Sequence, residues 1–221
     1  MRALAVTPIH LPAEEIRRRQ ARYDRLAPPG LRIELRDVGP AAPLALESED
    51  SVRASEREVA ATLDAAGDGF DLAFPDCVLD PAVPAGPAAG PARAVPVNGL
   101  LKLSAMHLAA KGVRFGAVVR NEAIGAELGR RLDAYGLAPH VAGIAVMELP
   151  FDAIADTAAW NAALVDAVGE LAARGAAAVI NGCSAVDVEA GPLPARVIDP
   201  TALALRLMTV EDEADQVGRA A

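Results

Sequence analysis

The chain reads Phe70-Asp71-Leu72-Ala73-Phe74-Pro75-Asp76-Cys77-Val78-Leu79-Asp80-Pro81 across the first of its two cysteines. This is a short apolar run that stops at an acidic, proline-bounded turn, a pattern typical of a buried strand and its end. The design returns around the second cysteine as Ala176-Ala177-Ala178-Val179-Ile180-Asn181-Gly182-Cys183-Ser184-Ala185-Val186-Asp187. Because α/β sheets present residues to ligands at strand ends, we expect both cysteines to face a ligand site.

Further similarities flank the two cysteines in the same order. Pro91-Ala92-Arg93 follows the first and Pro194-Ala195-Arg196 follows the second, and apolar strand patterns that begin at Arg2 and Arg114 precede them. Internal repeats signal repeated structural units. We therefore interpret the chain as two similar halves, each ordered strand, helix, strand, helix, strand with cysteine, strand.

This alternation predicts an α/β fold, because strand–helix–strand units form parallel sheets with right-handed crossovers. We expect two pseudo-symmetric parallel-sheet domains of the Rossmann or flavodoxin-like kind with an interdomain cleft, into which each half directs its cysteine. The first domain is predicted to span 1–97 and to be completed by a C-terminal helix at 200–221, and the second to span 98–199.

The individual elements follow from hydrophobic periodicity and from proline and glycine boundaries. Besides the two cysteine-bearing strands, strands are expected at 2–7, 31–35, 95–98, 114–119, 141–147 and 195–198, with 31–35 at a sheet edge. Helices are expected at 12–26, 49–66, 99–111, 122–135, 157–174 and 201–217. The Pro-, Ala- and Gly-rich segment 81–91 suits either a loop over the cleft or a plain spacer.

Composition excludes several classes of function. A net charge of −9 and only 3% aromatic residues argue against binding to nucleic acid or to an anionic membrane surface. No apolar run approaches the roughly 18 residues of a membrane span, and the N-terminus lacks a signal-peptide pattern. We therefore expect a cytoplasmic protein whose two cysteines are free thiols.

Motifs for metals and nucleotides were also sought. His10, His107 and His140 have no metal-ligand spacing with one another or with a cysteine. Neither a glycine-rich dinucleotide fingerprint nor a P-loop occurs. We expect no metal and no cofactor.

Two thiols suit one chemical task in particular. Inversion at an activated carbon needs a base on one face and an acid on the other, and a thiolate and a thiol can exchange these roles. We expect loop-to-helix turns after both cysteines, whose backbone N–H groups would lower the thiol pKa and stabilise an enolate. The alternative for each cysteine is a small buried hydrophobic residue in a strand.

Several segments resemble one known family, namely Asp76-Cys77-Val78-Leu79-Asp80-Pro81, Pro96-Val97-Asn98-Gly99, the strand 113–119, Tyr135-Gly136-Leu137 and Asn181-Gly182-Cys183-Ser184-Ala185. Together they are similar to the aspartate/glutamate/hydantoin racemase superfamily, closest to its hydantoin racemase-like branch. The resemblance implies a cofactor-independent cysteine pair that acts on a carbon acid between two domains. It also implies a small-molecule substrate and a homo-oligomer. The loop Thr7-Pro8-Ile9-His10 and the pair Arg120-Asn121 depart from the family pattern.

Substrate contacts are predicted around the catalytic pair Cys77 and Cys183. Arg120 could clamp a carboxylate, or be a surface arginine. His10 could orient substrate or act as a base, or be an exposed loop histidine, and Ser184 could donate to a substrate oxygen or cap a helix. For Asp76 and Asp80 we favour capping over tuning of Cys77. The predicted substrate-binding residues are Thr7, His10, Val78, Leu79, Arg120, Asn121, Ser184 and Ala185.

Three functions compete at this point. The first is a racemase or epimerase for an amino-acid-like or hydantoin-like substrate. The second is a decarboxylase or cis–trans isomerase of a small dicarboxylate on the same scaffold. The third is a non-catalytic protein that binds a small ligand. Such a decarboxylation can work with one cysteine, so the pair favours racemisation.

Overall fold

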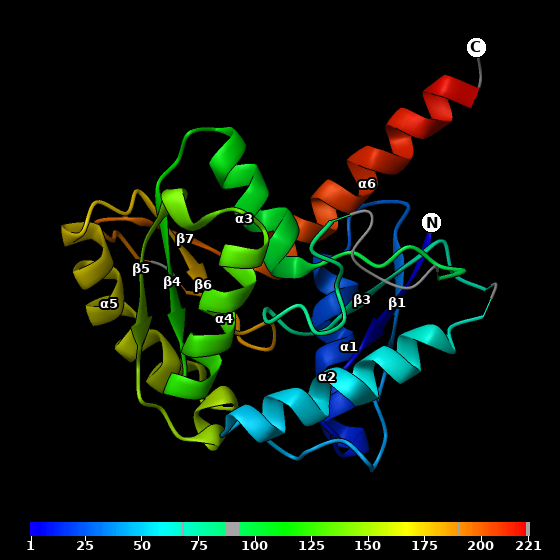
Figure 1. The fold of residues 1–221 in the computed structure, drawn as a ribbon, viewed down its shortest axis with the longest axis horizontal. Helices are drawn as coiled ribbons and strands as arrows, with labels where there is room; N and C mark the ends of the chain where they lie inside the picture. The colour runs from blue at the N-terminus through cyan, green and yellow to red at the C-terminus, as the bar shows by residue number, and fades with distance from the viewer. Residues whose placement is uncertain (68, 87–92, 190, 220–221) are drawn as a thin grey trace.

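The computed structural model describes residues 1–67, 69–86, 93–189 and 191–219, with side chains up to residue 210. Part of the predicted loop 81–91 and the last two residues of the predicted first domain lie outside these ranges. Figure 1 shows an α/β chain with two separate parallel sheets, as the sequence predicts. Among the described residues, no helix has both the length and the apolar character that crossing a membrane requires.

The two sheets have corresponding strand orders. The first has the order β2 (Arg32–Arg36), β1 (Arg2–Val6), β3 (Leu72–Pro75), and the second has the order β5 (Val141–Val146), β4 (Phe115–Val119), β6 (Ala178–Asn181), β7 (Arg196–Ile198). An isolated parallel bridge from Ala73 to Val97 takes the place in the first sheet that β7 takes in the second. The predicted two-fold repeat is therefore present in the strand order itself.

The helices lie close to their predicted positions. They are α1 (Ala13–Leu26), α2 (Glu49–Asp64), α3 (Leu100–Ala110), α4 (Glu122–Ala134), α5 (Thr157–Ala173) and α6 (Pro200–Arg219). Two short 3-10 helices, η1 (Ala138–His140) and η2 (Phe151–Ile154), were not predicted. Segments this short carry no periodic hydrophobic signal.

Burial follows from the sheet positions. The central strands β1 and β4 are almost entirely buried, because helices cover both faces of a parallel sheet. Strand β2 lies at an edge and alternates between buried and exposed residues, which confirms the prediction for 31–35.

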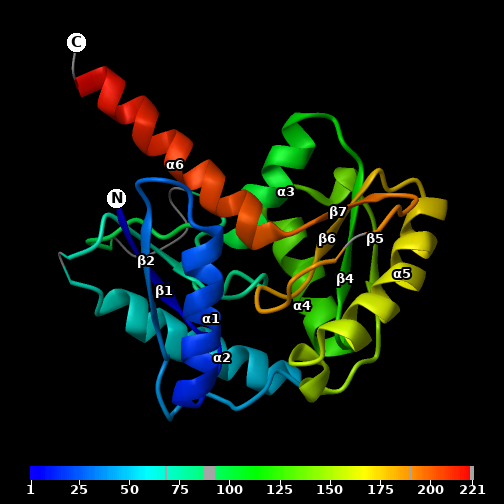
Figure 2. The same ribbon diagram turned by 180° about the vertical axis from the view of Figure 1, so that it is seen from behind.

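Helices α3 and α6 join the halves. They are equivalent in the repeat and lie side by side in both views of the ribbon (Figures 1 and 2), where Ser104 of α3 donates a hydrogen bond to the Pro200 carbonyl at 3.2 Å. Most of α3 packs on the core of the second half, whereas Leu205 and Met208 of α6 pack with Phe74 of the first. We therefore propose that the first domain is 1–97 together with α6 and that the second is 98–199.

Candidate active site

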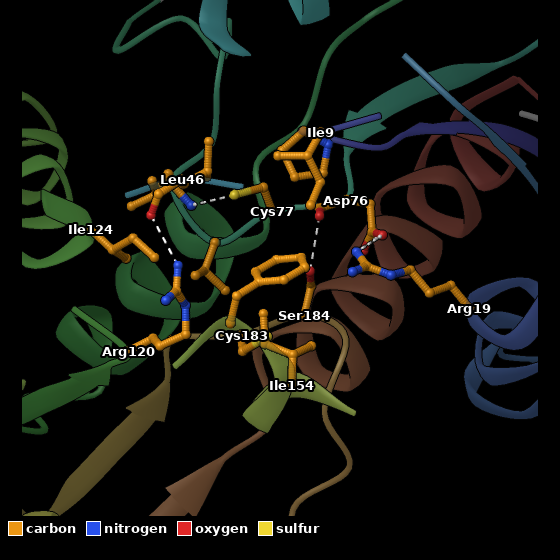
Figure 3. A pocket seen from close by; sticks show the side chains of 15 residues that line it. Ile9, Arg19, Leu46, Asp76, Cys77, Arg120, Ile124, Ile154, Cys183 and Ser184 are labelled. Atoms are coloured by element: carbon orange, nitrogen blue, oxygen red, sulfur yellow. Dashed lines mark hydrogen bonds and ion pairs between the residues drawn. The ribbon is translucent and has the colours of Figure 1, made fainter. Parts of the chain in front are cut away.

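A cavity lies where the carboxyl ends of β1 and β3 meet those of β4 and β6 (Figure 3). Its volume of about 60 Å³ is room for a few water molecules or one small ligand. Both cysteines line it, one from each half. Its polar lining also includes Arg19, Asp76, Arg120 and Ser184, and its apolar lining consists of Pro8, Ile9, Leu46, Val78, Leu79, Ile124, Phe151 and Ile154.

The two thiols have the same local geometry. Cys77 is the second residue after β3, and Cys183 is the second residue after β6. The N–H of Leu79 donates to the Cys77 sulfur at 3.4 Å, and the N–H of Ala185, two residues after Cys183, acts to lower the pKa of that thiol. Both cysteines are free thiols. Each half therefore places its sulfur two residues after a strand, with a backbone N–H two residues further on that favours the thiolate.

The prediction of loop-to-helix turns after the cysteines was wrong. Cys77 is followed by turns, and the next helix is α3 at Leu100; Cys183 is followed by a loop and then by β7. Burial raises the pKa of the Cys77 thiol to about 12, and Asp76 and Asp80 add to the rise. Burial also raises the pKa of Cys183, although Arg19 and Arg22 counteract it.

Asp76 connects three parts of the site and is 1% exposed. Its carboxylate accepts hydrogen bonds from Arg19 at 3.0 Å and from the Tyr23 hydroxyl at 2.7 Å. Its carbonyl accepts the Ser184 hydroxyl at 2.9 Å, across the cleft. Asp76 thus fixes α1, the Cys77 turn and the Cys183 loop relative to one another.

Asp76 and Asp80 were predicted to cap the Cys77 turn, but the carboxylate of Asp76 binds Arg19 and Tyr23 and that of Asp80 caps α3. The Asp80 carboxylate accepts the N–H groups of Leu101 and Lys102 at 3.1 and 2.8 Å and the Tyr135 hydroxyl at 3.0 Å. Gly99 gives it room, since a Cβ there would lie 2.3 Å from an Asp80 carboxylate oxygen. Burial raises the pKa of Asp80 to about 6 despite these donors.

The Cys183 loop is held by arginines of α1, which belongs to the other half. Arg22 donates to the Val186 carbonyl at 3.2 Å and pairs with Asp187 and Asp199 at 2.9 and 2.6 Å. Arg18 donates to the Ala185 carbonyl at 3.4 Å. These contacts set the position of the loop that carries the second thiol.

Arg120, at the end of β4 in the second half, holds a segment of the first half, just as the arginines of α1 hold the Cys183 loop. Its guanidinium donates to the Leu46 carbonyl at 3.0 Å and pairs with Glu47 at 2.8 Å, and it stacks over Phe151. At 3% exposure it is buried, so the surface-arginine alternative is wrong. Asn121 accepts the N–H of Ile124 as the N-cap of α4 and donates to the Leu46 carbonyl. The end of β4 thereby holds a segment of the first half against the cavity.

A family model described as Asp/Glu/Hydantoin racemase matches residues 16–208. The chain belongs to the Asp/Glu/hydantoin racemase family. The resemblance inferred from the sequence is thereby confirmed.

No curated protein sequence matches the chain. Several solved structures, however, have a similar fold. Allantoin racemase from Klebsiella pneumoniae is 21% identical with a TM-score of 0.75, over 97% of this chain and 89% of that one. Allantoin racemase from Pseudomonas fluorescens is 17% identical with a TM-score of 0.76, over 99% and 92%. An arylmalonate decarboxylase is 16% identical with a TM-score of 0.58, over 94% and 92%. At these identities the likeness shows the fold alone.

Six of the ten predicted site residues line the cavity of this racemase-family protein: Cys77, Val78, Leu79, Arg120, Cys183 and Ser184. The structure does not bring Thr7, His10, Asn121 and Ala185 to its wall. Thr7 and His10 both bond to Asp37, His10 at 2.6 Å, because residues 7–11 pack against the segment that follows β2.

Ser184 does not cap a helix. No helix begins in the described residues between Ser184 and β7, and its hydroxyl instead donates to the main chain of Asp76. Ala185 is buried with its carbonyl directed to Arg18.

The most consequential residue that sequence reasoning missed is Arg19. A signal was available, since Arg19 lies three residues after Ile16 and four before Tyr23, on the face of α1 that is buried. For Phe151 and Ile154 there was none, because η2 is too short for a pattern. Among the described residues, no group of three or more His, Cys, Asp or Glu side chains is placed to hold a metal ion.

Proposed function

We propose that the protein is a cofactor-independent racemase or epimerase that acts through Cys77 and Cys183 on an amino-acid-like or hydantoin-like carbon acid. The observation that carries the proposal is that one small cavity is lined by both thiols, one from each half, each the second residue after its strand. Family membership supports the same class of reaction.

In the proposed reaction, the thiolate of one cysteine takes the α-proton from one face of the substrate. The electron pair of the broken C–H bond passes into an enolate, and the thiol of the other cysteine gives its proton to the opposite face. The first sulfur ends as a thiol and the second as a thiolate. The N–H groups of Leu79 and Ala185 stabilise whichever sulfur is charged, and the apolar lining keeps water from reprotonating the enolate.

The charges of the cavity favour a substrate without a free negative charge. Arg19 is paired with Asp76 and Glu15, and Arg120 is paired with Glu47. No guanidinium charge in the described part of the cavity is therefore left uncompensated for a carboxylate. A neutral cyclic amide with an apolar substituent fits this lining better than a dicarboxylate does, since burying an unpaired charge is costly.

A proton-exchange screen tests the proposal. The protein is incubated in deuterated water with single enantiomers of 5-substituted hydantoins, allantoin, free amino acids and substituted malonates, and NMR detects α-deuteration. We expect deuteration together with loss of optical rotation for at least one cyclic amide, and neither with the Cys77→Ala/Cys183→Ala double variant. Exchange that persists in the double variant would contradict the proposal.

A decarboxylase is the second candidate, supported by the likeness of fold to arylmalonate decarboxylase. Release of carbon dioxide from a malonate, without racemisation of any substrate, would favour it. Ligand binding without exchange, unaltered by loss of both thiols, would favour the non-catalytic alternative. The expected homo-oligomer is tested by sedimentation velocity of the purified chain.

A further inference from the structure

The two sulfurs of the cavity lie in opposite electrostatic surroundings. Cys77 is in an acidic turn, with Asp76 before it and Asp80 three residues after it, and both carboxyls are buried. Cys183 faces α1, whose arginines hold its loop. The pseudo-symmetry of the backbone is therefore broken by the charges around it.

Arg19 is the arginine of α1 that lines the cavity itself. It is 5% exposed, with Nε donating to Glu15 at 2.8 Å and Nη1 donating to Asp76 at 3.0 Å. Among the described residues, its Nη2 has no hydrogen-bond partner. Figure 3 shows Arg19 reaching from α1 to Asp76, whose carbonyl accepts the hydroxyl of Ser184, the residue next to Cys183. One buried cationic group thus lines the cavity that the two thiols share.

The other arginines near Cys183, like Arg19 itself, are paired with carboxylates. Arg22 is tied to Asp187 and Asp199, and Arg120 is tied to Glu47. The groups that face Cys183 from the surrounding elements are Arg18, Arg19 and Arg22 of α1, Asp76 and Cys77 after β3, Arg120 after β4, and Asp187 in its own loop.

We propose that Arg19 makes Cys183 the base of the resting enzyme, while the acidic turn keeps the proton on Cys77. The proposal rests on the proposed two-thiol function and assigns a starting role to each thiol. Arg19 acts through Cys183, so it is a positioning residue for charge rather than a catalytic one. Its guanidinium is also the largest favourable influence on the pKa of Cys183, whereas the neighbouring charges of Cys77 all raise the pKa of that thiol.

The assignment has a consequence for turnover. The resting enzyme reacts first with the enantiomer whose α-hydrogen faces Cys183. After that reaction Cys183 is a thiol and Cys77 a thiolate, which is the form that reacts with the product enantiomer. Return to the resting form requires only that a proton move from Cys183 to Cys77 through solvent, so no other reactant is needed.

The test measures thiol ionisation in the enzyme without substrate, so it can fail while the racemase proposal stands. Iodoacetamide labels the protein across a range of pH, and mass spectrometry follows Cys77 and Cys183 separately. The pH at which the labelling rate of a thiol is half its maximum reports the ionisation of that thiol. The accessibility of the sulfur scales the rate equally at every pH, so it does not move this midpoint. In the parent enzyme we expect the midpoint of Cys183 to lie below that of Cys77. The reverse order would overturn the proposal.

Variants assign the effect to Arg19. Arg19→Gln should slow labelling of Cys183 at neutral pH by about tenfold or more, since a nearby opposite charge shifts ionisation by roughly one unit or more. Arg19→Lys should restore most of the rate. Arg17→Gln, at an exposed position on the same helix, is the matched control and should change nothing. An unaltered Cys183 midpoint in folded Arg19→Gln would overturn the proposal.

Asp76→Asn should move the labelling midpoint of Cys183 in the direction opposite to Arg19→Gln. Removing this carboxylate should lower the labelling midpoint of both thiols, because its charge opposes both thiolates. If Arg19→Gln does not fold, the double variant Arg19→Gln/Asp76→Asn removes both buried charges and leaves neither unpaired. There the gap between the two midpoints should shrink, and an unchanged gap would contradict the role of the pair.

Discussion

Gly182, the residue between β6 and Cys183, tests whether the geometry of the second thiol depends on a close backbone approach. A Cβ at this position would lie 2.0 Å from the Val118 carbonyl oxygen and 2.9 Å from a methyl group of Val119. Ordinary contact begins near 3.4 Å, so Gly182→Ala requires the ends of β4 and β6 to separate by about 1.4 Å. The obstacle is main chain within a sheet, which cannot move aside as a flexible side chain can.

The displacement has two measurable consequences. Overpacking of this kind lowers the free energy of unfolding by about 1–3 kcal/mol. A shift of about 1 Å in a reacting group lowers the rate by roughly a hundredfold, so proton exchange should fall further than stability does. Urea unfolding measures the first effect, and deuterium exchange on the substrate found by the screen measures the second.

Gly169 is the matched control. It lies within α5, and a Cβ there would meet nothing within 4 Å. Gly169→Ala should raise the free energy of unfolding by about 0.5–1 kcal/mol, because alanine favours a helix over glycine, and should leave exchange unchanged. A Gly182→Ala variant with parental stability and parental exchange would refute the reasoning about the close approach.

Three further predictions concern the surroundings of the site. The pKa of buried Asp80 is raised to about 6, so the folded state binds this proton more tightly than the unfolded state. Relative to Asp80→Asn, the parent should therefore lose about 3 kcal/mol of unfolding free energy as pH rises from about 4 to above 6, measured by urea unfolding; a difference independent of pH would contradict this. Arg120→Gln should lower the free energy of unfolding by about 1–3 kcal/mol, because the Leu149 carbonyl loses the guanidinium donor and the Leu46 carbonyl keeps only Asn121. Glu47→Gln at a half-exposed position should cost less than about 1 kcal/mol, and equal costs would show that the ion pair dominates. The two-thiol reaction uses no metal, so dialysis against a chelator should leave exchange unchanged, and activity restored by one divalent ion would contradict the mechanism.

The sequence predicted what depends on local pattern. Strands such as Leu72–Pro75 and Ala178–Asn181 are short apolar runs with marked ends, and their repeat predicted two similar halves with the cysteines at strand ends. Family resemblance and pattern agreed because both depend on the same buried strands.

What could not be predicted depends on contacts between distant segments. Arg19 reaches Asp76 over 57 positions, and His10 is bound by Asp37, 27 positions away. Neither pairing has a periodic signature, so Arg19 was missed as a cavity residue and His10 was predicted at a site that it does not line. The turns after the cysteines were predicted as helix starts because proline and serine mark both kinds of segment equally well.

The central claim is that one thiol serves each face of the substrate, and enantiomer-specific exchange in single-thiol variants tests it most directly. In Cys77→Ala and Cys183→Ala, deuterium incorporation is measured for each enantiomer in deuterated water, together with optical rotation. Racemisation should fall by orders of magnitude in both variants, because each lacks the acid for one face. Each variant should still exchange the α-hydrogen of one enantiomer with retention, and the two should prefer opposite enantiomers. Racemisation at the parental rate in both variants, or exchange of the same enantiomer by both, would contradict the account.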